Sequence, residues 1–587
     1  MLPPPLPPLE FKDLYEKIEY QIPMRDGVKL YTAVYVPRKP KGPFPIIMQR
    51  TPYSAGPYGK ESYKGSREDT PFVNAGYGFV FQDVRGRYMS EGEWENVRPI
   101  GRDKTDDATD CYDTVDFLVK NVKGNNGRVG MRGISYPGFY AGAGAINSHP
   151  ALKAVSPQAP VTDWFMGDDV YHRGAFFVQD NWGFSEWFDV PRKGLEQDHV
   201  GLPDYDHGPG GPYGFYLRMG NSNGLETNIA KGRIPYWKEI MEHDTYDAYW
   251  KERALQDKMK GVKCAMLTVG GLFDAEDMWG AIHLYQSTEK QNPGIYNGFV
   301  MGPWSHGQWA GKGTSLNGME FGSDTSAWFQ KNIEFPFFDR YLRGGANPKL
   351  AEATVFETGA NEWRRFNSWP PKDLKKKALY LATGKTLTAA PGAKESANAY
   401  ENDPAHPTPY LANPEQGDRP GGLLAQDEAW NAKRDDVLTY QGPVLTAPLR
   451  MAGPIDTDIW VTTTGTDMDL IVKVLDIWPA GTPYAGQMRM VRSEVIRGRF
   501  RDSWSDPKPF VPGQPTRIPL RLNDVLHTFG KGHRIGVMIQ SSWFPLVDRN
   551  PNRFVNVHKA KPTDYQKATI KILNGGKHAS RLSFGTL

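Results

Sequence analysis

The first part of the chain alternates short apolar runs with polar, turn-forming segments. Runs rich in β-branched and aromatic residues and bounded by glycine or proline predict strands, and apolar residues at helical spacing predict helices between them. The strands are expected at 29–37, 43–50, 76–84, 128–135 and 151–160, and the helices at 105–121 and 140–149. Apolar strands alternating with helices are typical of an open, mostly parallel α/β sheet.

The pattern changes twice further along. Between 161 and 262, Trp, Tyr, His and Asp are dense, Gly-Pro loops interrupt the chain, and residues 237–260 have a helical pattern, which predicts an insertion over the sheet. The strand–helix rhythm resumes at 262–271 and 296–304. After about residue 345 short alternating runs replace the long helices and predict an all-β domain of sandwich or jelly-roll type.

Composition excludes several classes of protein. A chain of 587 residues is too long for one hydrophobic core, which agrees with several domains. The net charge of +3, from 70 Lys and Arg against 67 Asp and Glu, argues against a nucleic-acid-binding protein. No stretch approaches the roughly 18 apolar residues of a membrane-spanning helix. Two cysteines, Cys111 and Cys264, exclude a disulfide scaffold and leave open whether they pair.

The segment VGMRGISYPGFYAG carries the strongest chemical signal. Ser135 lies where a buried strand turns into a helix, between Gly133 and Gly138, as a nucleophile does at the elbow of a hydrolase. The strict G-x-S-x-G pattern is not met, because Pro137 stands where the second glycine is expected. The alternative interpretation is an ordinary turn in which the serine caps a helix.

A nucleophilic serine needs a base, and in α/β-hydrolases the partners follow in the order Ser, Asp or Glu, His. Asp274 follows the strand at 262–271, and His306 follows the strand at 296–304. Catalytic groups gather at these carboxyl ends of a parallel sheet. His306 would take the proton of Ser135, and Asp274 would hold the imidazole in the correct tautomer. His149 and His172 precede Asp274 and fail this order.

These features together predict an α/β-hydrolase fold with a helical cap insertion and a C-terminal all-β jelly-roll domain. We assign residues 1–160 and 263–345 to the two parts of the hydrolase domain, 161–262 to the cap and 346–587 to the jelly roll.

Several motifs resemble one family of serine hydrolases over nearly the whole chain. They are RTPYSA, QDVRGRYMSEGEW, GISYPG, GPWSH and KGHRIGVMIQSSWFPLVDRNP. The family contains X-prolyl dipeptidyl peptidases, cocaine esterase, glutaryl-cephalosporin acylase and α-amino acid ester hydrolases. The resemblance implies that GxSYxG is this family's form of the elbow. It also implies an oxyanion hole made of the Tyr136 backbone N–H and the phenol of Tyr53.

Within this family, further residues resemble those of the α-amino acid ester hydrolases, in which three acidic side chains bind the α-ammonium group of the substrate. Asp169 in the segment GDD matches the first, and Glu276 and Asp277 in D-x-E-D match the others. Two other interpretations stay open. Asp168 and Asp169 could cap a helix, while Glu276 and Asp277 could favour the helix that follows them. A Ca²⁺ ion would also accept three carboxylates.

We therefore expect a serine hydrolase and acyltransferase that acts on esters and amides of α-amino acids through an acyl-enzyme on Ser135. The expected partners are small molecules, including β-lactam antibiotics with an α-amino acyl side chain and the β-lactam nucleus as acyl acceptor. We expect no metal or organic cofactor and no nucleic-acid or membrane partner. The alternatives are a glutaryl-cephalosporin acylase, a cocaine-esterase-like carboxylesterase, or a carbohydrate-binding protein with an inactive hydrolase fold.

The sequence carries little information on localisation. The opening MLPPPLPPLEFKD lacks the basic and apolar regions of a signal peptide. The family resemblance nevertheless implies a periplasmic or secreted protein that forms a homo-oligomer.

Overall fold

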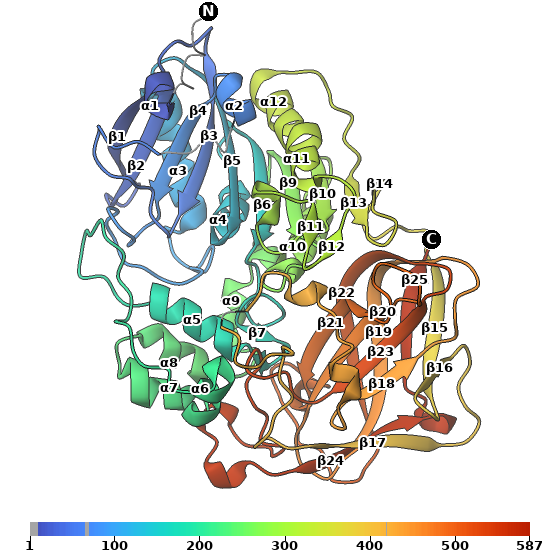
Figure 1. The fold of residues 1–587 in the computed structure, drawn as a ribbon. Coiled ribbons are helices and arrows are strands. Elements are labelled where there is room, and N and C mark those ends of the chain that lie inside the picture. Colours follow the sequence, from blue (N-terminus) through green and yellow to red (C-terminus); the bar gives the residue numbers. More distant parts are fainter. Residues whose placement is uncertain (1–9, 65–69, 418) are drawn as a thin grey trace, which may run out of the picture.

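A computed structural model describes residues 10–64, 70–417 and 419–587, so the proline-rich start at 1–9 lies outside the described residues. Figure 1 shows three parts: a sheet flanked by helices, a group of short helices below it, and an all-β domain at lower right. This is the α/β-hydrolase architecture with a helical cap and a C-terminal all-β domain that the sequence predicts.

The sheet of the hydrolase domain has ten strands in the order β1-β2-β4-β3-β5-β6-β9-β10-β13-β14. Neighbours from β4 to β13 run parallel, and the strands at both ends pair antiparallel. The strands are β1 (Tyr15–Pro23), β2 (Lys29–Pro37), β3 (Phe44–Thr51), β4 (Gly78–Asp83), β5 (Asn125–Ser135), β6 (Leu152–Pro160), β9 (Ala265–Gly271), β10 (Asn297–Gly302), β13 (Ala353–Glu357) and β14 (Glu362–Phe366). The central strands are buried on both faces, which explains their nearly continuous apolar sequences.

Helices cover both faces of this sheet. Helices α3, α4 and α10 pack on one face, and α12 packs on the other. The helices of the domain are α1 (Phe11–Leu14), α2 (Thr70–Asn74), α3 (Asp107–Asn121), α4 (Tyr136–Ala145), α10 (Met278–Gln291), α11 (Thr325–Phe329) and α12 (Phe335–Arg343), and a small hairpin, β11 (Ser315–Leu316) and β12 (Met319–Glu320), precedes α11. The carboxyl ends of the parallel strands are thereby left free for the cap.

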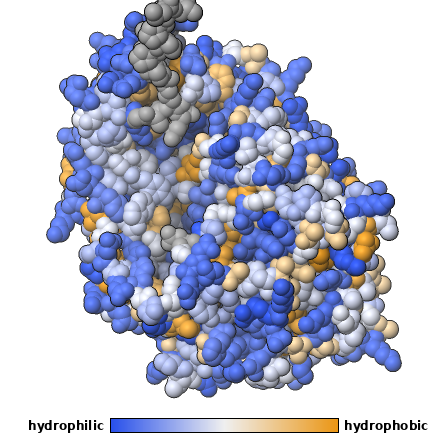
Figure 2. Space-filling view, viewed as in Figure 1, coloured by the Kyte–Doolittle hydropathy of each residue, from blue (hydrophilic) through white to orange (hydrophobic). Residues whose placement is uncertain are grey.

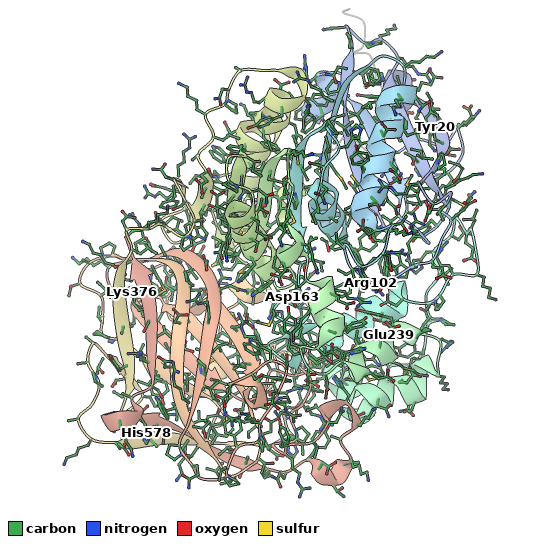
Figure 3. All side chains as sticks on the ribbon, turned by 180° about the vertical axis from the view of Figure 1, so that it is seen from behind. Tyr20, Arg102, Asp163, Glu239, Lys376 and His578 are labelled. Atoms are coloured by element: carbon green, nitrogen blue, oxygen red, sulfur yellow. The ribbon has the colours of Figure 1, made fainter. Side chains whose placement is uncertain are left out.

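The cap contains five short helices and one small hairpin. They are β7 (Tyr171–His172), β8 (Ala175–Phe176), α5 (Val178–Phe188), α6 (Gly211–Met219), α7 (Ser222–Leu225), α8 (Pro235–Glu242) and α9 (Ala248–Arg253). The helical pattern at 237–260 is broken into two helices and a 3₁₀ turn, because Asp247 accepts the Tyr249 N–H and starts a new helix. Asp163, at the start of the cap, lies where the three parts meet (Figure 3).

In the part of the chain that the structure describes, the all-β domain contains eleven strands. They are β15 (Lys375–Ala382), β16 (Thr386–Thr388), β17 (Ser396–Asn402), β18 (Leu438–Gln441), β19 (Leu449–Thr463), β20 (Asp469–Ile477), β21 (Met488–Arg497), β22 (Thr516–Phe529), β23 (Arg534–Gln540), β24 (Ala568–Asn574) and β25 (Arg581–Thr586). Two strands beyond the expected boundary at residue 346 extend the first sheet. Strands β13 and β14 follow it, yet β13 pairs parallel with β10 and completes the first sheet, because the edge of β10 needs a hydrogen-bonding partner.

Buried polar contacts fasten the all-β domain to the other two parts. Glu494 of β21 lies 2.9 Å from His172 Nδ1 and 2.7 Å from Arg173 Nη1, both in the cap. Arg492 Nη1 donates a 2.7 Å hydrogen bond to the carbonyl of Leu272, just beyond β9. The all-β domain therefore reaches the edge of the sheet where Asp274 lies.

The surface is mostly polar on the face seen in Figure 2, where hydrophobic residues form small, scattered groups. Within the described residues, no helix is both long and apolar enough to span a membrane.

Candidate active site

Ser135 occupies a strained turn between β5 and α4. Its backbone angles, φ 66° and ψ −128°, are rare for a residue with a side chain, and such strain is typical of functional sites. A Cβ at position 133 would lie 2.3 Å from the Pro137 carbonyl oxygen, and one at position 138 would lie 2.5 Å from the Gln158 carbonyl oxygen. The turn therefore needs glycine at both positions, while Pro137 lies in the first turn of α4, where proline is tolerated.

Asp274 and His306 lie just beyond β9 and β10, on the same edge of the sheet as Ser135. His306 Nδ1 is 3.0 Å from Asp274 Oδ2 and 3.2 Å from Asp274 Oδ1. Asp274 is 2% exposed, and its Oδ1 also accepts the backbone N–H groups of Glu276 and Asp277. Burial would raise the pKa of Asp274, but His306 and these hydrogen bonds outweigh burial and lower it. Asp274 is thus suited to hold a charged or neutral imidazole.

The other ring nitrogen of His306 faces a carboxylate in this arrangement. His306 Nε2 lies 3.4 Å from Glu276 Oε2. Among the described residues no hydrogen bond joins Ser135 to His306, and the Ser135 side chain lies beside the phenol of Tyr53. Catalytic hydrogen bonds are often incomplete without substrate, so this geometry does not exclude Ser135 and His306 as nucleophile and base.

Two hydrogen-bond donors lie beside Ser135. Tyr53 follows β3 on the same edge of the sheet; burial, together with Asp169 and Asp277, raises the pKa of its phenol well above the usual value, so the phenol stays protonated. Tyr136 is the first residue of α4, and the N–H at such a position has no partner within its helix. The Tyr136 phenol accepts the Val97 N–H at 2.7 Å, which anchors the residue.

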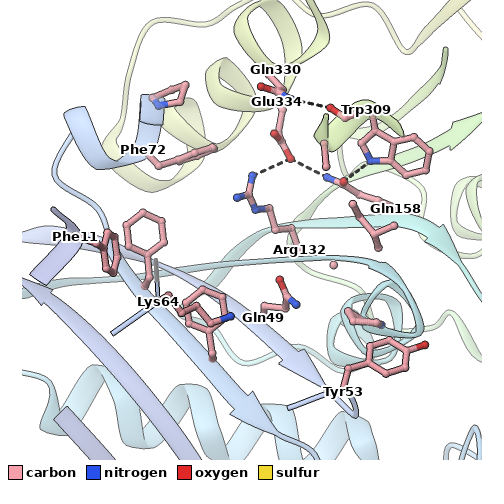
Figure 4. Close-up of a pocket in the computed structure, with 17 residues that line it drawn as sticks. Phe11, Gln49, Tyr53, Lys64, Phe72, Arg132, Gln158, Trp309, Gln330 and Glu334 are labelled. Carbon is pink, nitrogen blue, oxygen red and sulfur yellow. Dashed lines mark hydrogen bonds and ion pairs between the residues drawn. The ribbon is translucent and has the colours of Figure 1, made fainter. Parts of the chain in front are cut away.

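A buried polar network on the face of the sheet that α12 covers links the strand that carries Ser135 to the loop that carries His306. Arg132 Nη1 lies 3.1 Å from Glu334 Oε1, which accepts a 2.8 Å hydrogen bond from Gln158. Gln158 Oε1 in turn accepts the Trp309 indole N–H at 2.7 Å (Figure 4). These residues and Tyr53 line a cavity of about 400 Å³. The network ties the strand before Ser135 to the loop after His306, a role that residue spacing alone does not indicate.

The three predicted acidic residues lie around His306. Asp277 is 0% exposed, its Oδ2 lies 3.9 Å from His306 Nδ1, and within the described part of the chain neither carboxylate oxygen has a hydrogen-bond partner. Asp169, in a positive-φ conformation, accepts the Trp164 indole N–H at 3.0 Å, and its own N–H is bonded to the Glu276 carbonyl. We call Asp169, Glu276 and Asp277 the acidic cluster.

Helix capping is performed by a neighbour of the acidic cluster. Asp168 is fully buried and accepts the Gly280 N–H in the first turn of α10 at 2.7 Å, as well as the Thr162 N–H at 2.9 Å. Asp277 stands at the N-cap position of α10, but its side chain makes no capping hydrogen bond. The capping interpretation therefore fits Asp168 and does not account for Asp277.

The acidic cluster is electrostatically strained without a cation. Burial and the neighbouring Glu276 raise the pKa of Asp169 to about 7. Burial and the neighbouring Asp169 raise the pKa of Asp277 well above its usual value. Within the described residues, no group of three or more His, Cys, Asp or Glu side chains is arranged to hold a metal ion. The arrangement is suited to a cation that donates several hydrogen bonds.

Sequence reasoning missed one charged residue of this site. Arg419 comes from a loop of the all-β domain; its Nε lies 2.6 Å from Asp180 Oδ2 of α5, and its Nη2 is paired with Glu276 Oε1. All three side chains are largely shielded from solvent. No sequence signal marks Arg419, because its partners are in the cap and in the loop before α10.

Comparisons with known proteins find relatives over nearly the whole chain. Residues 26–308 match the X-Pro dipeptidyl-peptidase S15 family, and residues 346–583 match the X-Pro dipeptidyl-peptidase C-terminal non-catalytic domain. The chain is 27% identical to cocaine esterase from Rhodococcus sp. over 594 residues, which cover 96% of each protein.

Two solved structures superpose on the chain with a TM-score of 0.92. One is an aminopeptidase from a marine sediment Thaumarchaeota archaeon, 35% identical, with 100% of this chain and 98% of that one covered. The other is an α-amino acid ester hydrolase, 36% identical, with 100% and 99% covered. The chain belongs to the S15 family of serine hydrolases, the group that also contains cocaine esterase and the CocE/NonD hydrolases.

Proposed function

We propose that this S15-family hydrolase cleaves esters and amides of α-amino acids through an aminoacyl-enzyme on Ser135. The observation that carries the proposal is Asp277, a fully buried carboxylate beside His306 whose oxygens have no hydrogen-bond partner among the described residues. Such a group is costly unless a ligand pairs with it. An α-ammonium group offers both a positive charge and several N–H donors.

The proposed reaction uses the residues around Ser135 in two half-reactions. His306 Nε2 takes the proton of Ser135 as its oxygen attacks the substrate carbonyl, and Asp274 stabilises the imidazolium. The Tyr136 N–H and the Tyr53 phenol donate to the developing oxyanion. The carbonyl–leaving-group bond breaks, and His306 gives its proton to the departing alcohol or amine. Water, or an amine such as a β-lactam nucleus, then attacks the aminoacyl-enzyme by the same route.

The aromatic side chains beside Tyr53 support the proposal that the substrate carries a bulky apolar acyl side chain. The rings of Phe184, Trp187 and Phe188 from α5 have centroids 6.4, 5.8 and 5.4 Å from that of Tyr53. Phenylglycine esters, and β-lactams that carry a phenylglycyl side chain, combine an aromatic group with an α-ammonium group. They are therefore suitable test substrates.

A second candidate is aminopeptidase activity, because one of the two similar structures is described as an aminopeptidase. The same acidic cluster would receive the amino terminus of a peptide. By contrast, a glutaryl side chain would bring a further carboxylate against the cluster and is disfavoured by repulsion. A cocaine-esterase-like preference for neutral acyl groups would leave Asp277 unpaired.

The deciding experiment compares kcat/KM for phenylglycine methyl ester and phenylacetic acid methyl ester, which differ only in the amino group. We expect the amino ester to be preferred about 30- to 5,000-fold, since a desolvated charge pair contributes about 2–5 kcal/mol. Equal values would contradict ammonium recognition. Phenylglycine p-nitroanilide then distinguishes an enzyme that prefers esters from one that cleaves amides and peptides equally well.

A further inference from the structure

Both ring nitrogens of His306 face carboxylates. Nδ1 is 3.0 Å from Asp274 Oδ2, and Nε2 is 3.4 Å from Glu276 Oε2. A neutral imidazole donates from one nitrogen only, and its other nitrogen accepts. An accepting Nε2 directed at a carboxylate would be repelled, so this geometry requires a proton on both nitrogens. His306 is therefore an imidazolium in the arrangement seen here, and an imidazolium cannot take the proton of Ser135.

The charged groups around His306 come from three parts of the fold. The loop before α10 contributes Asp274, Glu276 and Asp277, and the cap contributes Asp169. The all-β domain contributes Arg419, which pairs with the other oxygen of Glu276 and with Asp180. Carboxylates thus outnumber the single arginine. Burial would lower the pKa of His306, but Glu276 and Asp274 outweigh burial and raise it to about 10.

Ser135 is correspondingly unengaged with its base. In the described residues no hydrogen bond connects its hydroxyl to His306, and its side chain lies beside Tyr53. Glu276 is held from the far side by Arg419, so one of its oxygens is committed and the other faces the imidazole. The base is thus paired with Glu276 and not with the nucleophile.

We propose that the substrate's α-ammonium group switches on the catalytic base by replacing His306 as the cationic partner of Glu276. This inference rests on the proposed function. When the ammonium pairs with the acidic cluster, the proton on Nε2 is lost to solvent, and Nε2 becomes free to accept the proton of Ser135. Substrate binding thus releases one proton and completes the Ser135–His306 pair. A neutral ester lacks this effect and meets a protonated base, so the acidic cluster selects substrates through reactivity as well as through binding.

The test uses a neutral ester, p-nitrophenyl acetate, because the pH profile of kcat/KM reports the ionisation of the free enzyme. Glu276→Gln removes the carboxylate at Nε2, which should lower the pKa of His306 by about 1–2 units. More His306 is then neutral at neutral pH, and kcat/KM for p-nitrophenyl acetate should rise about 10- to 100-fold. For phenylglycine methyl ester the same variant should lose activity. Opposite signs on the two esters cannot arise from a damaged site.

Glu334→Gln is the matched control. Glu334 is also a buried carboxylate paired with an arginine, Arg132, but it lies on the opposite face of the sheet. This variant can change the rate only through altered positioning, so the acidic limb of the p-nitrophenyl acetate profile should stay where it is in the wild type.

A second measurement needs no mutation. Methylammonium added to the wild type should raise kcat/KM for p-nitrophenyl acetate at neutral pH, because it can occupy the acidic cluster, whereas sodium at the same ionic strength should not.

The inference is overturned if the acidic limb for p-nitrophenyl acetate does not move in Glu276→Gln, or if both esters lose activity in equal proportion. Failure of the proposed function gives a different result. In that case the wild type shows no preference for the amino ester over its deaminated analogue, whatever the pH profile of the variant.

Discussion

Replacing Asp277 with asparagine tests two effects of this residue separately: its contribution to substrate binding and its effect on the free energy of unfolding. The side chain is 0% exposed, and among the described residues its oxygens accept no hydrogen bond. Asp277→Asn keeps the shape and removes the charge. If Asp277 binds the α-ammonium group, the variant loses one partner of a desolvated charge pair, and kcat/KM for phenylglycine methyl ester falls about 30- to 5,000-fold. By contrast, kcat/KM for p-nitrophenyl acetate should not fall in this variant.

The same substitution should stabilise the folded protein. A buried polar group without a partner costs about 1–3 kcal/mol, and more when it is charged, so a neutral amide should raise the free energy of unfolding by about that amount at neutral pH. This gain in the free energy of unfolding depends on pH. The folded pKa of Asp277 is raised above its unfolded value, so the folded state binds more protons and the wild type loses stability as pH rises above the unfolded pKa. Below that pKa both states are protonated, and the gain should vanish.

Urea unfolding of wild type and Asp277→Asn at acidic and neutral pH measures this directly, together with kcat/KM on the two esters. A variant that is less stable at neutral pH, or that loses activity equally on both esters, would show that Asp277 supports the structure near His306 instead of binding substrate. A gain in stability that is the same at both pH values would contradict the raised pKa.

Three further predictions concern the chemical step and the cation. Ser135→Ala should reduce turnover about 10⁴-fold or more and abolish labelling by a fluorophosphonate, with an unchanged melting curve; labelling that persists would identify another nucleophile. Tyr53→Phe should cost about 10²- to 10³-fold in kcat through loss of one oxyanion donor, and an effect confined to KM would assign Tyr53 to pocket shape. Asp169→Asn should cut kcat/KM for phenylglycine methyl ester steeply and spare p-nitrophenyl acetate, and a loss restored by added Ca²⁺ would instead support a metal site.

The pattern along the chain was sufficient for the architecture and for the order of the chemical groups. Strands that are buried on both faces and alternate with helices form a parallel sheet, and residues directly after such strands meet at one edge. Ser135, Asp274 and His306 lie at that edge because each ends a strand or follows one closely, and Tyr53, which was identified only through the family resemblance, lies there as well. Each of these positions depends only on the strand next to the residue along the chain, so it can be recognised in the sequence.

Other relations depend on which segments meet in space. Adjacent aspartates at 168 and 169 have the same sequence signal, yet one caps α10 and the other borders His306, because the positive-φ turn at Asp169 directs the two side chains apart. The first sheet also takes β13 and β14 from the chain beyond residue 345, and this pairing depends on where the edge of β10 lies in space.

The charge state of the site is the clearest case of a property decided by tertiary structure. The sequence by itself determined that Ser135, Asp274, His306 and the residues of D-x-E-D would lie at one edge of a hydrolase sheet. Only the folded molecule brings Arg419 from the all-β domain onto Glu276 and turns the other oxygen of Glu276 toward His306. The physical reason is that electrostatic interactions depend on distance and burial, and neither is fixed by separation along the chain.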